Sequence, residues 1–247
     1  MGSFVFAASI GFLLAVCTWE LFNMCGRPLV PYLGAAMLGV LVLLLLPQFF
    51  DIHRWVQGPA FAALLSLLCM LFMSELAKQR FVIPADALGL CLRSLLLFGV
   101  MGMYMVLLRN LPMGLLWVLG LVGLVWTNDI AAYLVGSSLG KRKLARSISP
   151  KKTVEGAVGA VLASVAFVLL FNHFLLRQPW ATMLAFAVLG SVVAQFGDLH
   201  ESLTKRKFRA KDSGAWFPGH GGVYDRIDSF LFLTPLTYYL VVFLSHS

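Results

Sequence analysis

Carboxylates and basic side chains alternate in a short stretch of the sequence, residues 195–228, which lies between two long apolar runs. Two groups of acids within it are spaced by three residues, so each group lies on one face if its segment is helical. The acids are Asp198 and Glu201, then Asp225 and Asp228. Two such helix ends brought together would present four carboxylates, the ligand type that Mg²⁺ prefers when it also holds substrate phosphates. The stretch therefore predicts a divalent-cation site.

The basic side chains of the same stretch do not suit a cation, but they complement a triphosphate or a lipid phosphate brought to it. The alternative is that they only orient the chain in a membrane and touch anionic headgroups. We favour phosphate binding for Lys205, Arg206, Lys211 and Arg226.

A glycine-rich loop, residues 218–222, separates the two groups of acids. Glycine allows tight turns and close approach of the backbone to a phosphate, although such loops alone are a weak signal. His220 lies among these glycines and could donate to a phosphate or carry a proton, because histidine titrates near neutral pH. By contrast, His200 lies between two acids in sequence but on a different face of the predicted helix.

A second polar stretch begins with Asp129 and Tyr133 and continues into a run at 149–156. Thr153 is a plausible N-cap for the next helix, so free backbone amides and two lysines would converge on one anion-sized site. We expect this site to cradle nucleotide phosphates. Its residues are Ser149, Lys151, Lys152 and Thr153. For the nearby Lys141, Arg142, Lys143 and Arg146, which follow no fixed pattern, orientation of the chain in the membrane or contact with the lipid surface is favoured.

These polar stretches must be positioned by apolar helices, because 60% of the residues are hydrophobic and only 12% are charged. A bilayer core needs about 20 apolar residues per helical crossing. We predict an all-α, polytopic membrane protein with about eight spans, although the fourth, which contains Arg93, and the seventh are the least secure, and seven spans would also fit. The first run lacks a basic start and a cleavage site, so we expect a retained helix. The spans are 3–22, 29–49, 57–77, 87–108, 113–135, 154–176, 181–199 and 229–245.

The net charge of +8 is distributed in a way that favours a membrane over nucleic acid as the partner. The loops after spans one, three, five and seven hold fifteen Lys and Arg residues, whereas the opposite loops hold Arg54, Arg109 and Arg177. We therefore expect the basic loops, and the chemistry, to face the cytoplasm.

The chain is expected to form one continuous membrane domain, with N-terminal helices in 1–126 and the catalytic loops in 127–247. The first part carries four scattered carboxylates, for which we expect structural roles near the interface. They are Glu20, Asp51, Glu75 and Asp86. The four cysteines show no paired spacing typical of a metal site or disulfide framework.

The polar stretches resemble the signature of one enzyme family, the phosphatidate cytidylyltransferases or CDP-diacylglycerol synthases. That signature reads S-x-x-K-R, four residues, K-D-x-G, then P-G-H-G-G and D-R-x-D. The resemblance is specific over 129–229 and compositional before it. This sequence supplies Ser202, Lys205, Arg206, Lys211, Asp212, Gly214, Pro218, Gly219, His220, Gly221, Gly222, Asp225, Arg226 and Asp228.

The resemblance implies that a phosphatidate oxygen attacks the α-phosphorus of CTP, with Mg²⁺, and room for a second cation, at the centre. It implies that Asp198 and Asp225 contact the metal, with Glu201, Asp228 and Asp129 nearby. It also assigns Lys211, Asp212 and His220 to catalysis and Ser202, Gly221 and Gly222 to substrate binding.

Two rival functions fit the same pattern. A CTP-dependent polyprenol kinase would use similar membrane placement but transfer the γ-phosphoryl group, and a transporter would also carry acids within its spans. Clustering of the acids at one face argues against a transporter. We expect the bacterial inner membrane as the compartment, membrane lipids as partners and a homodimer as a further option.

Overall fold

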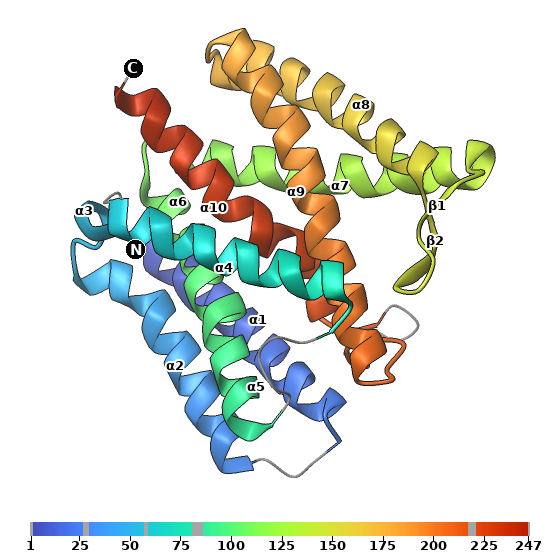
Figure 1. Cartoon of the computed structure of the whole chain (residues 1–247). Helices are drawn as coiled ribbons and strands as arrows, with labels where there is room; N and C mark the ends of the chain where they lie inside the picture. The colour runs from blue at the N-terminus through green and yellow to red at the C-terminus, as the bar shows by residue number, and fades with distance from the viewer. Residues whose placement is uncertain (1, 27–29, 57–58, 81–85, 217–220, 247) are drawn as a thin grey trace.

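The computed structural model describes residues 2–26, 30–56, 59–80, 86–216 and 221–246. Helices fill nearly all of this part, and two short antiparallel strands form a hairpin beside them (Figure 1). The all-α class is therefore confirmed, with the hairpin as an addition that the sequence did not predict. In chain order the elements are α1 (Gly2–Met24), α2 (Val30–Phe49), α3 (His53–Val56), α4 (Pro59–Lys78), α5 (Ala87–Ser94), η1 (Leu95–Met101), α6 (Gly102–Asn110), α7 (Gly114–Leu139), β1 (Lys143–Ala145), β2 (Ser149–Thr153), α8 (Val154–Phe171), η2 (Asn172–Leu176), α9 (Trp180–Lys207) and α10 (Tyr224–His246).

Seven helical segments in the described part are long and apolar enough to cross a bilayer. Two of them are composite, because η1 joins α5 to α6 and η2 extends α8 as π-helical turns. The 20-residue α4 occupies the position of the predicted third span, and only some of its side chains are described. The fold thus agrees with the prediction of about eight spans, of which seven are long and apolar enough to cross a bilayer in the described part.

Two helices are longer at their polar ends than hydropathy predicted. α9 continues to Lys207 and α10 begins at Tyr224, whereas the predicted spans covered 181–199 and 229–245. The added turns carry charged side chains, which lower the local hydropathy although the turns are helical. α9 and α10 pack against each other, and Glu20 of α1 accepts a hydrogen bond from the N–H of Tyr224 at the start of α10. The acidic residues therefore lie on helices and not in loops.

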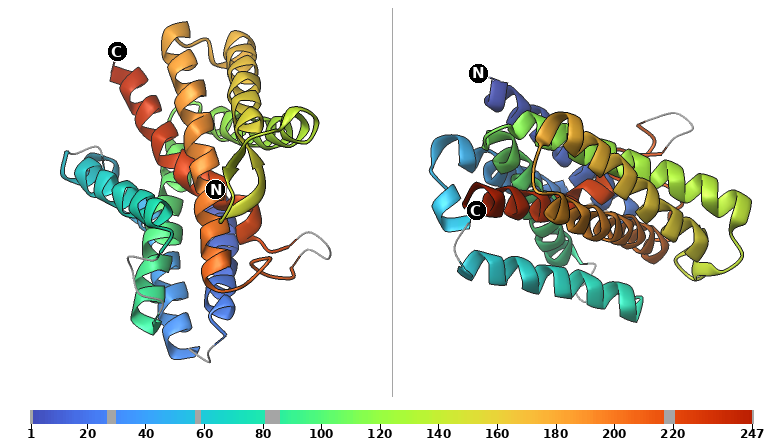
Figure 2. Two further views of the ribbon diagram at one scale, coloured as in Figure 1. Left: turned by 45° about the vertical axis from the view of Figure 1, so that its right-hand side comes forward. Right: turned by 90° about the horizontal axis from the view of Figure 1, so that it is seen from above.

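Two large apolar clusters and a smaller one around Tyr104 form the core of the described part, and α10 contributes to all three. One large cluster is built from α1, α2 and the α5–η1 segment, and the other from α6 to α9. Leu231 of α10 belongs to the first cluster and Leu233 to the second. Figure 2 shows α7, α8 and α9 lying together, with α4 along the outside of the bundle. α10 is therefore the central helix, with its first turn near the polar loops.

Candidate active site

Three carboxylates from two helices meet at the polar end of the bundle. Asp198 and Glu201 of α9 and Asp228 of α10 each offer one oxygen, and these oxygens lie within 4.8 Å of one another. Glu201 and Asp228 are buried, whereas the side chain of Asp198 is 35% exposed. Buried Oε1 of Glu201 has no hydrogen-bond donor among the described residues. The group therefore suits a divalent cation, which prefers such oxygens and would compensate their charge.

A glycine brings the two acid-bearing helices together. At Gly197 an added Cβ atom would lie 2.9 Å from the carbonyl oxygen of Asp228 and 2.9 Å from Cα of Ser229. Any side chain at this position would push α9 away from α10. Gly197 therefore sets the spacing between Asp198 and Asp228.

Asp225 lies beside this group and already accepts hydrogen bonds from the protein. Nζ of Lys205 is 2.7 Å from Oδ1 of Asp225 and 2.9 Å from Oε2 of Glu201. The backbone N–H groups of Ser213 and Gly222 donate to Oδ2 of Asp225 at 3.0 and 2.7 Å. The structure thus brings Glu201 and Asp228 to the side of Asp198, and links Asp225 to them through a lysine. Direct metal contact by Asp225 stays a prediction.

Glu20 of α1 organises the loop before α10. Its carboxylate accepts hydrogen bonds from the N–H groups of Val223 at 2.9 Å and Tyr224 at 2.8 Å, and from Oγ of Ser213 at 3.1 Å. Glu20 is fully buried, and these contacts give it the structural role that was expected. A negative charge at a helix N-terminus is stabilised by free amides and by the helix dipole. Gly222 leaves room for this carboxylate, since a Cβ atom there would collide with it.

A cleft of about 560 Å³ opens beside Asp198, between α7, the hairpin, α8 and α9. Lys152 forms an ion pair with Asp198 across it. Oγ1 of Thr153 accepts a hydrogen bond of 3.1 Å from the N–H of Gly156, which confirms Thr153 as the N-cap of α8. Cations, amides and a carboxylate thus face one space large enough for a phosphate-bearing ligand. Its polar lining includes Asp129, Tyr133, Lys143, Lys151, Lys152 and Asp198.

The inner end of this cleft contains a polar network that joins Gln195, the first residue of the acidic stretch, to Asn128 and Ser191, which the sequence motifs did not include. Oγ of Ser191 donates to Oδ1 of Asn128 at 2.6 Å, and Nε2 of Gln195 donates to the carbonyl of Ala157 at 3.3 Å. The network joins α7, α8 and α9. Asn128 could have been found by the rule applied to Asp129, because both are polar residues inside a long apolar run.

The hairpin is fastened to its neighbours by charged residues. The N–H groups of Lys141 and Arg142 donate to Glu155 at 3.0 and 3.1 Å, and Nε of Arg206 donates to the carbonyl of Ile148 at 3.2 Å. Arg206, which we predicted to bind phosphate, therefore has at least one structural contact. Its phosphate contact stays a prediction.

The remaining predicted residues lie around this centre or outside the described part. Gly221 has φ of +82°, a conformation that favours glycine, and Gly222 donates to Asp225 as described above. His220, with Pro218 and Gly219, falls outside the described residues. Other predicted residues lie beyond the lining of the cleft, with the last three exposed: Ser149, Ser202, Lys211, Asp212 and Arg226.

A buried charge cluster holds α4 and α5 against the back of α9. Nη2 of Arg93 is 2.6 Å from Oε1 of Glu75, and Nε2 of His200 is 3.3 Å from Oε2 of Glu75. Arg93 made the fourth span uncertain in the sequence, and its pairing explains how the span accommodates it. Glu75 is fully buried and has the structural role that was expected, and His200 pairs with Glu75 and not with the acid group.

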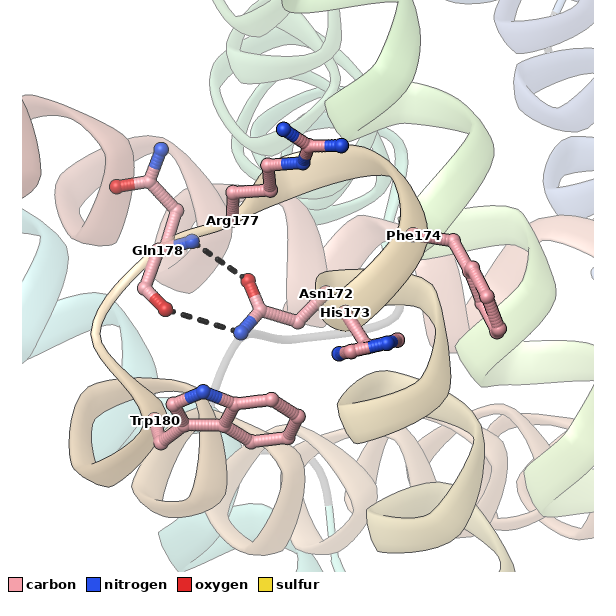
Figure 3. A pocket seen from close by; sticks show the side chains of 6 residues that line it. All are labelled: Asn172, His173, Phe174, Arg177, Gln178 and Trp180. Carbon is pink, nitrogen blue, oxygen red and sulfur yellow. Dashed lines mark hydrogen bonds between the residues drawn. The ribbon is translucent and has the colours of Figure 1, made fainter.

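A second pocket, of about 410 Å³, lies at the opposite ends of α8 and α9 (Figure 3). Asn172 closes its loop, accepting a hydrogen bond of 2.8 Å from the N–H of Gln178 and donating one of 3.0 Å to the carbonyl of Gln178. His173 and Trp180 line it with their rings 6.0 Å apart. No carboxylate is among its described lining residues, so it does not share the chemistry of the cleft.

Similarity to known proteins extends over nearly the whole chain. A sequence profile of the cytidylyltransferase family matches residues 1–244. The phosphatidate cytidylyltransferase of Bacillus subtilis is 36% identical over 250 residues, which cover 99% of this chain and 91% of that protein. Those of Staphylococcus epidermidis and Staphylococcus aureus are 38% and 34% identical, covering 94% and 98% of this chain and 88% and 91% of theirs. The likeness therefore includes the early helices, for which the motifs gave no information.

Proposed function

The chain belongs to the cytidylyltransferase family, and we infer that it transfers CMP from CTP to phosphatidate, giving CDP-diacylglycerol and pyrophosphate. The observation that carries this function is the cluster of Asp198, Glu201 and Asp228 at the edge of a lysine-lined cleft. Family membership supports the choice of CTP and phosphatidate. The geometry alone would support only cation-assisted transfer between phosphates.

The reaction joins two polyanions, so repulsion is the main obstacle. A phosphatidate oxygen attacks the α-phosphorus of CTP, a new P–O bond forms, and the bond to the bridging β-phosphate oxygen breaks. The phosphomonoester has a second pKa of about 6, so its oxygen is largely deprotonated at neutral pH without a strong base. Lys151, Lys152 and the free amides at the start of α8 would bind and orient the phosphates.

We propose that Asp198, Glu201 and Asp228 hold Mg²⁺. Their oxygens converge, and a buried oxygen of Glu201 lacks a donor in the described part of the chain. The ion, when bound, supplies positive charge next to the transferring phosphoryl group. Lys205 forms ion pairs with both Glu201 and Asp225. Its charge offsets the repulsion between the two carboxylates and orients both.

We propose that this site faces the cytoplasm of a bacterial inner membrane. Lys143, Lys151 and Lys152 line the cleft, and cytoplasmic loops of membrane proteins are enriched in Lys and Arg. The homodimer stays a prediction, which the mass of the protein in detergent would test.

Labelled CTP tests the function against both rivals. Purified protein in detergent should transfer α-labelled phosphate into phosphatidate and release pyrophosphate, with dependence on a divalent cation. Transfer of γ-label into a polyprenol, with CDP as product, would support the kinase instead. Turnover without vesicles would exclude a transporter as the sole function, since transport needs two compartments.

A further inference from the structure

A third hollow, of about 520 Å³, lies against the outside of α9. It is walled by α4, the hairpin and α9, and its lining is mainly apolar. Met73 of α4 is 39% exposed and Leu144 of β1 is 38% exposed, so both side chains reach the surface of this space. We call it the apolar groove. Its apolar lining includes Met73, Leu76, Leu144, Ile148, Phe196 and Leu199.

The apolar groove adjoins the polar cleft across a single strand. Leu144 lines both spaces, whereas Lys143 lines the cleft but not the groove, and Ala145 lines the groove but not the cleft. Strand β1 is therefore the partition between them. The two spaces together form one amphipathic site, with three lysines and two aspartates on the cleft side of β1 and mainly apolar side chains on the groove side.

The two spaces also lie at the same level of α9. Gln195 and Asp198 line the cleft, and the residues directly after them, Phe196 and Leu199, line the groove. Successive residues of an α-helix are turned by about 100° around its axis. A ligand in the groove would therefore lie at the level of the acid group along α9, on the adjacent face of the helix.

We propose that the apolar groove holds an acyl chain of phosphatidate while its phosphate reaches the cleft. This assignment rests on the proposed function and names the path of the lipid substrate. A phosphate joined to long alkyl chains needs a cationic and an apolar space that meet, which is the arrangement around Leu144. Arg146 and Gln79 line the groove as well, and the charge of Arg146 complements the anionic headgroup.

α4 makes the groove accessible from lipid. It lies along the outside of the bundle in Figure 2 and packs on α9 near its C-terminal half. A chain leaving the bilayer could thus enter the groove laterally without crossing the polar loops. A second protein chain on this face would cover Met73 but would bring no phosphate to the cleft.

A pair of methionines on α4 gives a matched test. Met73→Trp fills the groove, whereas Met70→Trp changes a side chain that is 67% exposed and does not line it. Met73→Trp should raise KM for long-chain phosphatidate about tenfold and leave KM for CTP unchanged, because it removes only acyl contacts. The KM for a water-soluble dihexanoyl phosphatidate should rise much less. Equal effects of the two variants, or a rise in KM for CTP, would overturn the proposal.

A binding measurement separates this proposal from the proposed function. Full-length protein is irradiated with phosphatidate carrying a diazirine in its acyl chain, and labelled peptides are mapped. Label on 73–79 or 144–148, displaced by phosphatidate but not by phosphatidylcholine, is expected. If turnover is normal but the label falls on other peptides, the groove assignment alone is overturned. The same holds if phosphatidate and phosphatidylcholine displace the label equally. Absence of both turnover and labelling overturns the proposed function and the groove with it.

Discussion

α8 and α9 carry a pocket at each end, and the two pockets differ in charge much more than in size. At the hairpin end, the cleft of about 560 Å³ sets Lys152 against Asp198. At the η2 end, the pocket of about 410 Å³ is closed by Asn172 bonded to the backbone of Gln178. Both open beside α8 and α9 and are lined by polar and apolar side chains. Opposed charges, and not volume, therefore distinguish the candidate active site.

The largest expected contrast between the two ends comes from Asp198 and Arg177. Asp198→Asn should lower kcat by about a thousandfold, because it removes one charge from the proposed cation site. Arg177→Ala, at the opposite pocket, should keep activity within about twofold. Initial rates with labelled CTP, on variants matched for yield and thermal unfolding in detergent, measure both. A large loss in Arg177→Ala would show that the opposite pocket takes part in turnover.

Asp225→Asn tests the acid that lies beside the proposed cation group. The amide oxygen can take the place of Oδ2 and accept from both backbone N–H groups, but the ion pair that Oδ1 forms with Lys205 is lost. We expect turnover to fall by about a hundredfold while membrane insertion and unfolding temperature change little. Size-exclusion profiles and melting curves serve as controls. Loss of folding instead would mean that Asp225 acts mainly through structural salt bridges.

Lys152→Met tests the cationic wall of the cleft with a smaller expected effect. Removing this ammonium group should raise KM for CTP about tenfold, since charge-assisted phosphate contacts contribute about 1.5–3 kcal/mol. Lys152→Arg should recover part of the loss, because it restores the charge. If Lys152→Met lowers kcat and leaves both KM values unchanged, the lysine serves the transition state and not ground-state binding of CTP.

The sequence predicted the acids and lysines of the hairpin end because helical spacing and sequence proximity placed them together. Asp198 and Glu201 follow that spacing, and Thr153 follows the N-cap rule. Glu20 could not be assigned in this way, because its partners Val223 and Tyr224 are about two hundred residues away. Only tertiary packing of α1 beneath the loop reveals its role.

The ends of α9 and α10 show a different limit of sequence reasoning. Hydropathy left the charged turns outside the predicted spans, at the end of α9 and at the start of α10, although those turns are helical. A charged side chain lowers hydropathy whether it meets water or a partner in the protein. Glu75 and Arg93 illustrate the same point inside the bundle, where their ion pair replaces contact with solvent.

Asn172→Ala gives the smallest expected effect and tests whether the opposite pocket is purely structural. The side chain is 1% exposed and makes two hydrogen bonds to the backbone of Gln178. Its loss should destabilise the protein by about 1–3 kcal/mol, because two backbone groups lose their partner. Activity at a temperature well below unfolding should stay near that of the parent chain. Asn172→Asp is the sharper companion, since it keeps the acceptor for Gln178 N–H but loses the donor, and it should unfold at an intermediate temperature. Activity that falls while stability holds would make the η2 end a functional site, and the contrast between the two ends of α8 and α9 would then be wrong.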